Sequence, residues 1–418
     1  MTETLDVYLD HDLTGRLTRS RDGQVSFDYF GHPTDTPLSV SMPRSRERHD
    51  PDVVMPWLDN LLPDNDDVRA RWAAQFGERR ATAFNLLRHV GADCAGAVQI
   101  LPDGEAPGTT GTLTPITDAD IAAHIRTLRG DAAAWDFAER GGRWSLGGQQ
   151  GKFALTRGTE GEWLLPGGRA ASTHIVKVGV AGLPESDIAE FVTMRAAALL
   201  ELPTPPVEYV PFDDERALVT TRFDRLATPT GTRRLHQEDL CQALGLWRTM
   251  KYQSDGGPSA RKVIDLLRQT LDPRDRERGV ADFLRAQVFN WLVAGTDAHA
   301  KNYAVLHIGA RVVLAPFYDL VSAAFFWPAR DLHFEGRLAM KFGGQYRLRK
   351  VDLGRCRQMA DDLGVDEDFL VTTARRYNDQ VLDAVASAMI DLPNSVSTSQ
   401  RRGMTDAIAA RLASVKIP

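Results

Sequence analysis

Cysteine is scarce in this sequence, with only three residues among 418. Cys94, Cys241 and Cys356 lie far apart and form no C-x-x-C spacing, which excludes a disulfide framework and a cysteine zinc site. This usage suits a reducing compartment, and we interpret the three as small apolar residues of the protein core.

The sequence also lacks a long apolar run, a basic leader and an excess of positive charge. No stretch approaches the apolar length of a membrane span, and the opening residues carry acids where a secretory signal needs a basic and then an apolar segment. We therefore expect a soluble, cytoplasmic protein with no membrane partner. The formal net charge of -6 argues against a surface made for nucleic acid, so DNA binding would need a local basic patch or a partner protein.

Four different patterns follow one another along the chain. Residues 4 to 41 hold short runs of alternating apolar and polar residues, which predict a small antiparallel sheet. Residues 101 to 115 contain three prolines and three glycines without apolar periodicity, which predicts a linker. Strand-like runs come next, and helical patterns dominate the last part. We expect an α+β fold with a β-rich part over 1–104, a second part over 116–240 and a mainly helical part over 241–418.

A glycine-rich stretch, "LGGQQGK" at residues 146 to 152, raises the question of phosphate binding. A P-loop would need a glycine at Leu146 and a serine or threonine at Phe153, because that hydroxyl binds magnesium. The glycines also miss the spacing of the dinucleotide-binding fingerprint. Spacing alone therefore excludes both familiar loops and leaves the role of this stretch open.

A second stretch has the residues that phosphoryl transfer requires. Helical periodicity before Asp297 places this residue at a helix end, and two strand-like runs, 303–308 and 311–316, predict a hairpin with a turn at Gly309. A hairpin returns the chain to its starting point. Asp319, just after the second strand, should therefore lie close to Asn302, just before the first.

Asp297 and Asn302 have the D-x-x-x-x-N spacing of a kinase catalytic loop. In such a loop the aspartate accepts the proton of the attacking hydroxyl and the asparagine holds magnesium, while a second carboxylate, here Asp319, binds the metal that bridges the phosphates. His299 and Lys301 could add charge or hydrogen bonds to the phosphoryl group. Asp and Asn are also common at helix ends as caps, and a lone histidine is more often structural. The hairpin and the following aspartate favour the catalytic interpretation.

A kinase further needs a strand lysine that holds the nucleotide phosphates, commonly paired with a helix glutamate. Lys177 lies in the alternating run "HIVKV" upstream of Asp297, and Glu190 on the next helix is its candidate partner. Lys177 could instead be a solvated strand lysine. Glu190 could instead form a capping box with Asp187.

The segments around these residues resemble the HipA family, the serine/threonine kinase toxins of bacterial toxin-antitoxin modules. The resemblance runs from about residue 56 to residue 324 in the order found in that family. It is carried by the segments "WLDNLLPD", "GADCAGAVQI", "SLGGQQGKFAL", "THIVKVG", "TRFDR", "LHQEDLCQALG", "KYQSDGGPSARKVIDLLR", "FNWLVAGTDAHAKNYAVL" and "LAPFYDLVSA".

The resemblance implies a two-lobed protein-kinase-like fold that uses ATP and Mg²⁺, with the nucleotide lobe over 116–240 and the catalytic lobe over 241–418. It implies that Asp297 is the catalytic base and that Asn302 and Asp319 are the magnesium ligands. The ATP-binding residues that it implies are Gly147, Gly148, Gln149, Gln150, Gly151, Lys152, Lys177, Thr221, Arg222, Phe223, His299, Ala300, Lys301, Asn302, Tyr318 and Asp319.

Ser145 matches the serine that this family autophosphorylates, a modification that draws the loop out of the site and silences the kinase. A phosphoserine adds about -1.5 to -2 charge and three acceptor oxygens beside the glycine-rich loop, so we expect it to compete with ATP. Gly151 and Thr221 depart from the family pattern, which often has glutamate at both positions. A backbone contact to adenine at Thr221 survives this change, whereas a contact through the glutamate side chain does not.

The implied activity is transfer of the ATP γ-phosphate to a translation-related protein and to Ser145. The prototype target is glutamyl-tRNA synthetase, and related toxins can choose another aminoacyl-tRNA synthetase. The implied partner is a small HipB-like helix-turn-helix antitoxin, which supplies most of the affinity for operator DNA. Two alternatives stay open, a kinase of small molecules or lipid head groups and a catalytically silent corepressor of a helix-turn-helix partner. The intact set of Asp297, Asn302, Asp319 and Lys177 argues against the silent corepressor.

Overall fold

The computed structural model describes residues 3–31, 35–107, 111–135, 137, 144–180, 182–183, 185–229, 231–415 and 417. The chain divides into two compact units. Unit 1 comprises Met1–Gly182, Val210–Thr249 and Ala304–Ala315, and unit 2 comprises Leu183–Tyr209, Met250–Tyr303 and Pro316–Pro418. The boundaries 1–104, 116–240 and 241–418 stay predictions.

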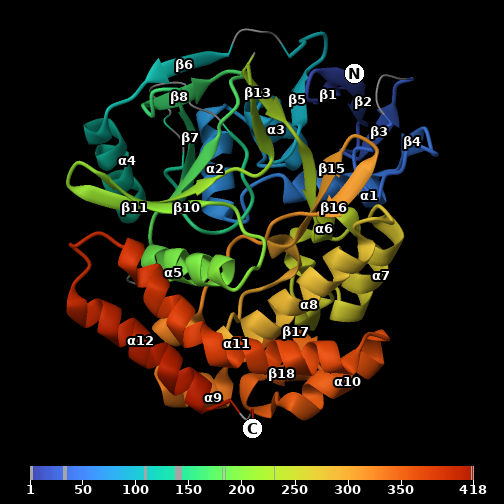
Figure 1. Ribbon diagram of the computed structural model, residues 1–418. Coiled ribbons are helices and arrows are strands. Elements are labelled where there is room, and N and C mark those ends of the chain that lie inside the picture. The colour runs from blue at the N-terminus through green and yellow to red at the C-terminus, as the bar shows by residue number, and fades with distance from the viewer. Residues whose placement is uncertain are drawn as a thin grey trace. The chain divides into compact units, whose positions relative to one another are not determined.

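Unit 1 opens with a five-stranded antiparallel sheet in the order β4-β3-β2-β1-β5 (Figure 1). Its strands are β1 Glu3–Leu9, β2 Asp12–Arg19, β3 Val25–Tyr29, β4 Arg48–His49 and β5 Val98–Pro102. Helices α1 Pro51–Asn60, α2 Asp66–Gln75 and α3 Ala83–Val90 follow β4. Val7, Leu17 and Phe27 are completely buried on the inner face and share one core with Trp57 of α1. The small antiparallel sheet predicted for residues 4 to 41 is confirmed over β1 to β3, but Ser39 and Met42 form only an isolated bridge.

A six-stranded sheet follows, in the order β10-β11-β9-β7-β8-β6. Its strands are β6 Thr112–Pro115, β7 Lys152–Arg157, β8 Trp163–Gly167, β9 His174–Lys177, β10 Val207–Phe212 and β11 Glu215–Thr221. Helix α4, Asp118–Gly130, begins with a capping box between Thr117 and Asp120 and packs on β11. β5 and β6 form both ends of the predicted linker 101–115, of which residues 108–110 lie outside the described part of the chain.

Two smaller sheets complete unit 1. A hairpin of β12 and β13 stands alone, and β14, β15 and β16 form an antiparallel sheet in that order. The bounds are β12 Arg225–Thr228, β13 Gly231–Arg234, β14 His236–Asp239, α6 Leu240–Ala243, β15 Ala304–Ile308 and β16 Arg311–Leu314. The predicted hairpin is therefore present, with its turn at Gly309, which has φ of 63°.

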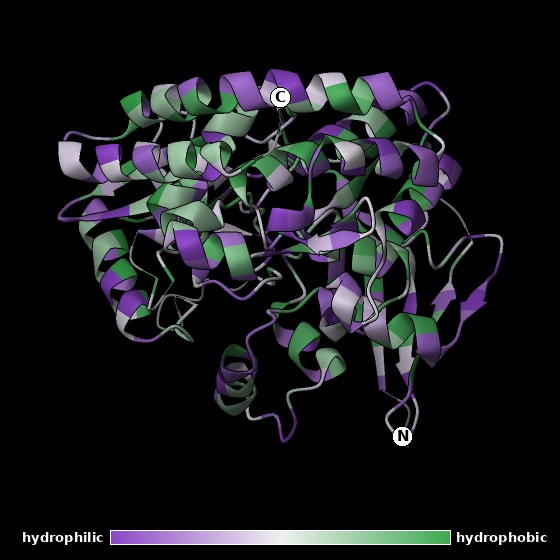
Figure 2. Cartoon of the chain, turned by 90° about the horizontal axis from the view of Figure 1, so that it is seen from below, coloured by the Kyte–Doolittle hydropathy of each residue, from purple (hydrophilic) through white to green (hydrophobic). Residues whose placement is uncertain are grey.

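Unit 2 is mainly helical. Its helices are α5 Ser186–Leu199, α7 Ala260–Thr270, α8 Arg276–Val293, α9 Ala329–Glu335, α10 Leu353–Leu363, α11 Glu367–Ala388 and α12 Thr398–Ala413, and its strands are β17 Arg337–Phe342 and β18 Gln345–Arg347. α11 packs against α5, α8, α10 and α12 (Figure 1). Figure 2 shows that hydrophilic and hydrophobic residues both occur along the long helices. Across the described ranges, no helix combines the length and the apolar character that a membrane crossing needs.

Candidate active site

The loop that carries the predicted catalytic base begins where α8 ends. Ala294 adopts a left-handed conformation with φ of 58°, and the N–H of Gly295 donates to the carbonyl of Asn290 at 2.7 Å. A Cβ atom at Gly295 would lie 2.4 Å from Oδ1 of Asn290, so only glycine fits here. The helix therefore ends tightly, and the chain turns into the loop that holds Asp297.

Asp297 and Asn302 are brought together, as their spacing predicts. The Nδ2 of Asn302 donates to the backbone carbonyl of Asp297 at 2.9 Å, and the N–H of His299 donates to the same carbonyl at 2.8 Å. The short 3₁₀ helix Ala300–Asn302 follows. Because Nδ2 of Asn302 is used in this bond, Oδ1 is the atom of its amide that can hold a cation.

A neighbouring segment orients the carboxylate of Asp297. The hydroxyl of Tyr252 donates to Oδ1 of Asp297, and the Tyr252 ring meets the His299 ring edge to face at 5.0 Å between centroids. The N–H of Ala300 donates to the carbonyl of Lys251 at 3.0 Å, which fixes the same segment to the loop. The sequence does not mark a role for Tyr252, although this residue lies in the segment "KYQSDGGPSARKVIDLLR" that resembles the HipA family.

The hairpin returns the chain as predicted. Val305 pairs with Leu314 in the register of β15 and β16. Within unit 2, the hydroxyl of Tyr318 donates to the carbonyl of Lys301 at 2.7 Å. Lys301 precedes Asn302 in the sequence, and Tyr318 precedes Asp319. This bond therefore lies next to both predicted metal ligands.

The backbone at Asp319 has an uncommon conformation. Its φ of 56° lies in the left-handed region, which aspartate enters more readily than most residues with a side chain. The segment after it is anchored to the end of α8, since the hydroxyl of Ser322 donates to the carbonyl of Val293 at 2.5 Å and the N–H of Ala323 donates to that of Ala294 at 3.0 Å. The same helix end thus positions Asp297 and the segment that follows Asp319.

The donor atoms at this loop suit magnesium. Mg²⁺ prefers oxygen ligands, and it commonly takes one or two from protein side chains and the rest from water and substrate phosphates. Asn302 and Asp319 offer an amide and a carboxylate oxygen. His299, Ala300 and Lys301, the other predicted residues of this loop, are buried beside them.

The glycine-rich loop of unit 1 is folded over Lys152. The Nζ of Lys152 donates to the carbonyl of Gly147 at 2.8 Å and lies 5.3 Å from the centroid of the Trp135 ring. Gly148 has φ of 97°, a conformation that favours glycine, and a Cβ atom there would lie 2.6 Å from this Nζ, so a larger residue would displace the lysine side chain. The carbonyl of Gly148 accepts from the N–H of Asp64 at 2.8 Å, and Gln150 Nε2 donates to the carbonyl of Val178 at 2.9 Å.

Two buried lysines meet on the sheet beneath this loop. Lys152 of β7 pairs with Lys177 of β9 in the antiparallel register, and their exposed fractions are 4% and 6%. Directly opposite residues of an antiparallel pair project from the same face, so the two side chains are neighbours. The sequence predicts each lysine separately but not their pairing. Glu190, the predicted partner of Lys177, is buried on α5 in unit 2, and that ion pair stays a prediction.

The predicted hinge Thr221–Phe223 begins at the last residue of β11. The N–H of Arg222 donates to the carbonyl of Thr173 at 2.9 Å. The buried guanidinium of Arg222 binds both carboxylate oxygens of Asp224, at 2.9 and 2.8 Å, and donates to the hydroxyl of Ser172 at 2.8 Å. Its side chain is therefore committed to an ionic network, and only the backbone of Arg222 is left for a nucleotide.

Asp93 is the second acid of this network, and no sequence motif marks it. Its carboxylate accepts from the hydroxyl of Ser172 at 2.5 Å, from Nη2 of Arg225 at 2.9 Å and from Nη2 of Arg234 at 3.3 Å. Burial opposes the ionisation of Asp93, but Arg225, Arg222 and Arg234 outweigh it and hold its pKa below the ordinary value. "GADCAGAVQI" contains Asp93, yet neither the burial nor these partners are visible in the sequence.

Ser145, the predicted autophosphorylation site, is completely buried between Trp144 and Leu146. Its hydroxyl donates to the carbonyl of Leu61 at 2.7 Å, and its N–H donates to the carbonyl of Asp93 at 2.9 Å. Asp93 thus contacts both Ser145 and the network that holds the hinge.

Comparison with known proteins gives matches over almost the whole chain. The HipA N-terminal domain family matches residues 5–101, and the HipA-like C-terminal domain family matches residues 144–389. The chain is 32% identical to the protein Y4mE of Sinorhizobium fredii over 427 residues, covering 99% of this chain and 98% of that protein. It is 29% identical to the serine/threonine-protein kinase toxin HipA of Shewanella oneidensis over 408 residues, covering 94% of this chain and 90% of that protein.

A solved structure shows the same fold. It is the complex of HipA and HipB of Shewanella oneidensis with its operator DNA, with a TM-score of 0.82 and 26% sequence identity. The match covers 98% of this chain and 96% of that chain. The predicted α+β, HipA-like fold is confirmed.

Proposed function

Since this chain belongs to the HipA family and is a serine/threonine-protein kinase, we propose that Asp297, Asn302 and Asp319 form its phosphoryl-transfer centre. The observation that carries this assignment is the hydrogen bond between the Tyr318 hydroxyl and the Lys301 carbonyl. It joins the segment of Asp319 to the segment of Asn302, the two proposed metal ligands. The bond from Asn302 to the Asp297 carbonyl adds the base to the same loop.

In the proposed mechanism, the Asp297 carboxylate accepts the proton of a serine or threonine hydroxyl as that oxygen attacks the γ-phosphorus of ATP. The phenol of Tyr252 holds Oδ1 of Asp297, which leaves Oδ2 as the proton acceptor. Asn302 and Asp319 would hold magnesium, which neutralises charge on the phosphate oxygens when bound.

We assign phosphate binding to the Lys152 and Lys177 pair. The two buried lysines project from one face of the sheet, so a phosphate beside them would be held by both ammonium groups. The glycines of 147 to 151 would supply backbone N–H groups, and Lys152 would exchange the carbonyl of Gly147 for phosphate oxygen. The backbone of Thr221–Phe223 would meet the adenine.

We further propose that Ser145 is the residue through which the kinase silences itself. Its hydroxyl is buried and bonded to the Leu61 carbonyl, so it can accept a phosphoryl group only after this loop has left its place. A phosphate of about -1.5 to -2 charge cannot return to a completely buried position without a large desolvation cost. The phosphorylated loop would therefore stay out of its place over the nucleotide site, and the phosphorylated kinase would not bind ATP.

The substrate and partners follow from the relatives and remain proposals. The relative HipA of Shewanella oneidensis is named as a kinase toxin, and its structure contains HipB and operator DNA. For this chain we propose a HipB-like helix-turn-helix antitoxin that supplies most of the DNA affinity. We propose a protein substrate in translation, with an aminoacyl-tRNA synthetase as the first candidate, and hence action in the cytoplasm.

Radiolabelled ATP tests the substrate class. The purified full-length protein is incubated with ATP, Mg²⁺ and a bacterial extract, and label is measured separately in precipitated protein and in the soluble fraction. We expect label in one or a few protein bands and at least about 100-fold less label with Asp297→Asn. Label that remains in small molecules would support a small-molecule kinase and reject the proposal.

A further inference from the structure

The last long helix, α12, buries an arginine that has no acidic partner. Arg411 has an exposed fraction of 4%, and within the described part of the chain no carboxylate lies at ion-pair distance from its guanidinium. Burial lowers the pKa of Arg411 to about 10, which leaves it charged at neutral pH. Buried charges are usually paired, because an unpaired charge loses its hydration without compensation.

The hydrogen bonds of Arg411 use only part of its donor capacity. Nη2 donates to the carbonyl of Trp291 at 2.6 Å, and Nη1 donates to the hydroxyl of Ser414 at 3.0 Å. Nε has no hydrogen-bond partner among the residues that the structure describes. A guanidinium has five N–H donors, so most of them are available to a further acceptor.

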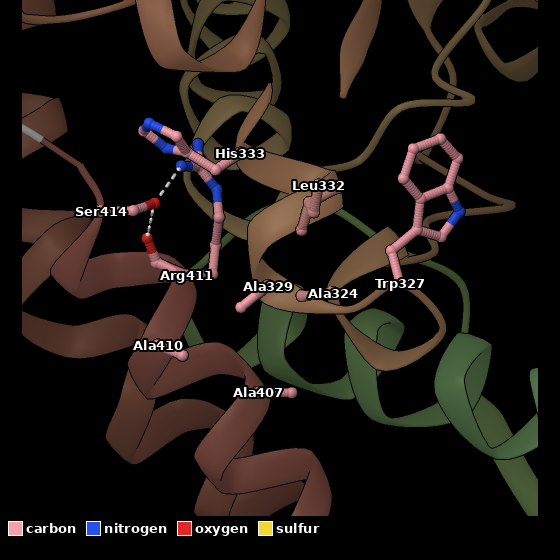
Figure 3. Close-up of a pocket in the computed structure, with 9 residues that line it drawn as sticks. All are labelled: Ala324, Trp327, Ala329, Leu332, His333, Ala407, Ala410, Arg411 and Ser414. Atoms are coloured by element: carbon pink, nitrogen blue, oxygen red, sulfur yellow. Dashed lines mark hydrogen bonds between the residues drawn. The ribbon is translucent and has the colours of Figure 1, made fainter. Parts of the chain in front are cut away.

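The guanidinium lines a cavity of about 50 Å³ between α9 and α12 (Figure 3). Ser414 and His333 lie at the same cavity, and Nδ1 of His333 is buried without a hydrogen-bond partner among the described residues. Small side chains, among them Ala410, leave the space open. A water molecule needs at least about 10 to 15 Å³ by this measure, so the cavity admits several waters or one compact ion.

A purely structural role explains only one of these contacts. Arg411 bonds the Trp291 carbonyl in the last turn of α8, where a cation interacts favourably with the helix dipole. That contact requires neither the cavity nor the half-buried His333 beside it. The remaining donors, the net positive charge and the space beside them all point to an anion.

We propose that this cavity binds a compact oxyanion of the size and charge of inorganic phosphate. Arg411 supplies charge and N–H donors, and the imidazole of His333 supplies a further polar contact. The hydroxyl of Ser414 donates to the carbonyl of Arg411 at 2.6 Å and accepts from Nη1, so it holds the guanidinium in place. The anion would neutralise the buried charge of Arg411, which contacts the last turn of α8. The loop of Asp297 follows this helix. The site belongs to unit 2 alone and does not depend on the proposed phosphoryl-transfer centre.

Calorimetric titration of the full-length protein with inorganic phosphate, against chloride at matched ionic strength, tests this site. Since phosphate can also enter the proposed ATP site, the same titration is made with Lys177→Met. We expect a saturable heat in the wild type and in Lys177→Met. Arg411→Met should weaken the binding at least tenfold, whereas Arg402→Met, at an exposed arginine of the same helix, should not change it.

Ala410→Leu provides a second variant that leaves Arg411 in place. Ala410 is exposed and lines the cavity, so a leucine there should fill the cavity and weaken phosphate binding without unfolding the chain. This variant decides the matter if Arg411→Met does not fold, and circular dichroism checks both. Absence of saturable phosphate binding in the wild type would overturn the proposal. So would unchanged binding in a folded Ala410→Leu protein.

Discussion

The amide of Asn302 reaches back to the carbonyl of Asp297 at 2.9 Å, so one hydrogen bond fixes the separation of the proposed base and the proposed metal ligand. Neither residue needs the rest of the chain for this contact, because both lie in one short loop after α8. A substitution can therefore change the proposed base or the proposed metal ligand without changing the other residue.

Asp297→Asn keeps the shape of the side chain but removes its ability to accept a proton. We expect the rate of phosphorylation to fall by about 100-fold to 10,000-fold, the range of general-base contributions. The measurement is initial-rate kinase activity, with thermal unfolding as the check on the fold. Asp255→Asn, at an exposed acid of the preceding segment, is the matched control and should retain activity. Full activity of Asp297→Asn would rule out its role as base.

Tyr252→Phe removes the hydroxyl that holds the Asp297 carboxylate and keeps the ring against His299. A hydrogen bond to a charged group contributes about 1.5–3 kcal/mol, so we expect kcat to fall roughly tenfold to 100-fold. KM for ATP should stay the same, because Tyr252 is proposed to orient the base only. Tyr346→Phe is a suitable control. A change in KM with an unchanged kcat would contradict the orienting role.

Ser145→Asp places a charge where the structure has a buried hydroxyl. We expect the loop to leave its position, ATP affinity to fall and proteolysis around residues 144–152 to become faster. Ser145→Ala is the control, since it removes only the bond to Leu61 and should cost about 0.5–1.5 kcal/mol of stability. Equal ATP affinity of the two variants by calorimetry would refute the electrostatic account of silencing.

Asp93→Asn removes a buried charge from among three arginines. We expect the free energy of unfolding at pH 7 to fall by about 3–5 kcal/mol, the effect of breaking a buried ion pair. The control is Asp103→Asn, because Asp103 is half-exposed and paired with Arg16. This substitution should change the free energy of unfolding by less than about 1 kcal/mol. Urea titration measures both.

The pH dependence of the same variant has a definite sign. Because the folded pKa of Asp93 is lowered, its contribution is complete above the ordinary aspartate pKa of about 3.9 and is lost as the pH falls toward the folded value. Asp93→Asn should therefore lose less stability than the wild type as the pH falls below about 4. If the free energy of unfolding fell equally in both proteins as the pH was lowered, Asp93 would not be the titrating group.

The sequence could predict the Asp297 loop because its parts are local. Helical periodicity locates the end of α8, two short strands give the hairpin, and a hairpin must return Asp319 toward Asn302. The sequence could not predict that Lys152 pairs with Lys177. This pairing depends on the register between two strands, and the sequence pattern identifies each strand only by itself. The resemblance identified Ser145, but not that its hydroxyl is buried.

The ionic network around the hinge illustrates a second limit. Arg222 contacts Asp224 nearby in sequence, yet Ser172 and Asp93 join it from distant segments. Periodicity reports which residues are apolar, whereas a buried charge looks like any surface charge until its partners are placed. The structure is therefore needed to see that the proposed adenine contact at Arg222 has only backbone atoms to use.

The end of α8 contacts two separate segments through three hydrogen bonds, from Ser322 to Val293, from Ala323 to Ala294 and from Arg411 to Trp291. Any displacement of this helix must carry the Asp297 loop and the segment after Asp319 along together. A rigid shift of α8 would therefore change the direction in which the proposed centre faces its substrate, while the distance between the proposed base and the proposed metal ligand stayed constant. Substrate access and catalytic geometry would then be separately adjustable in this fold.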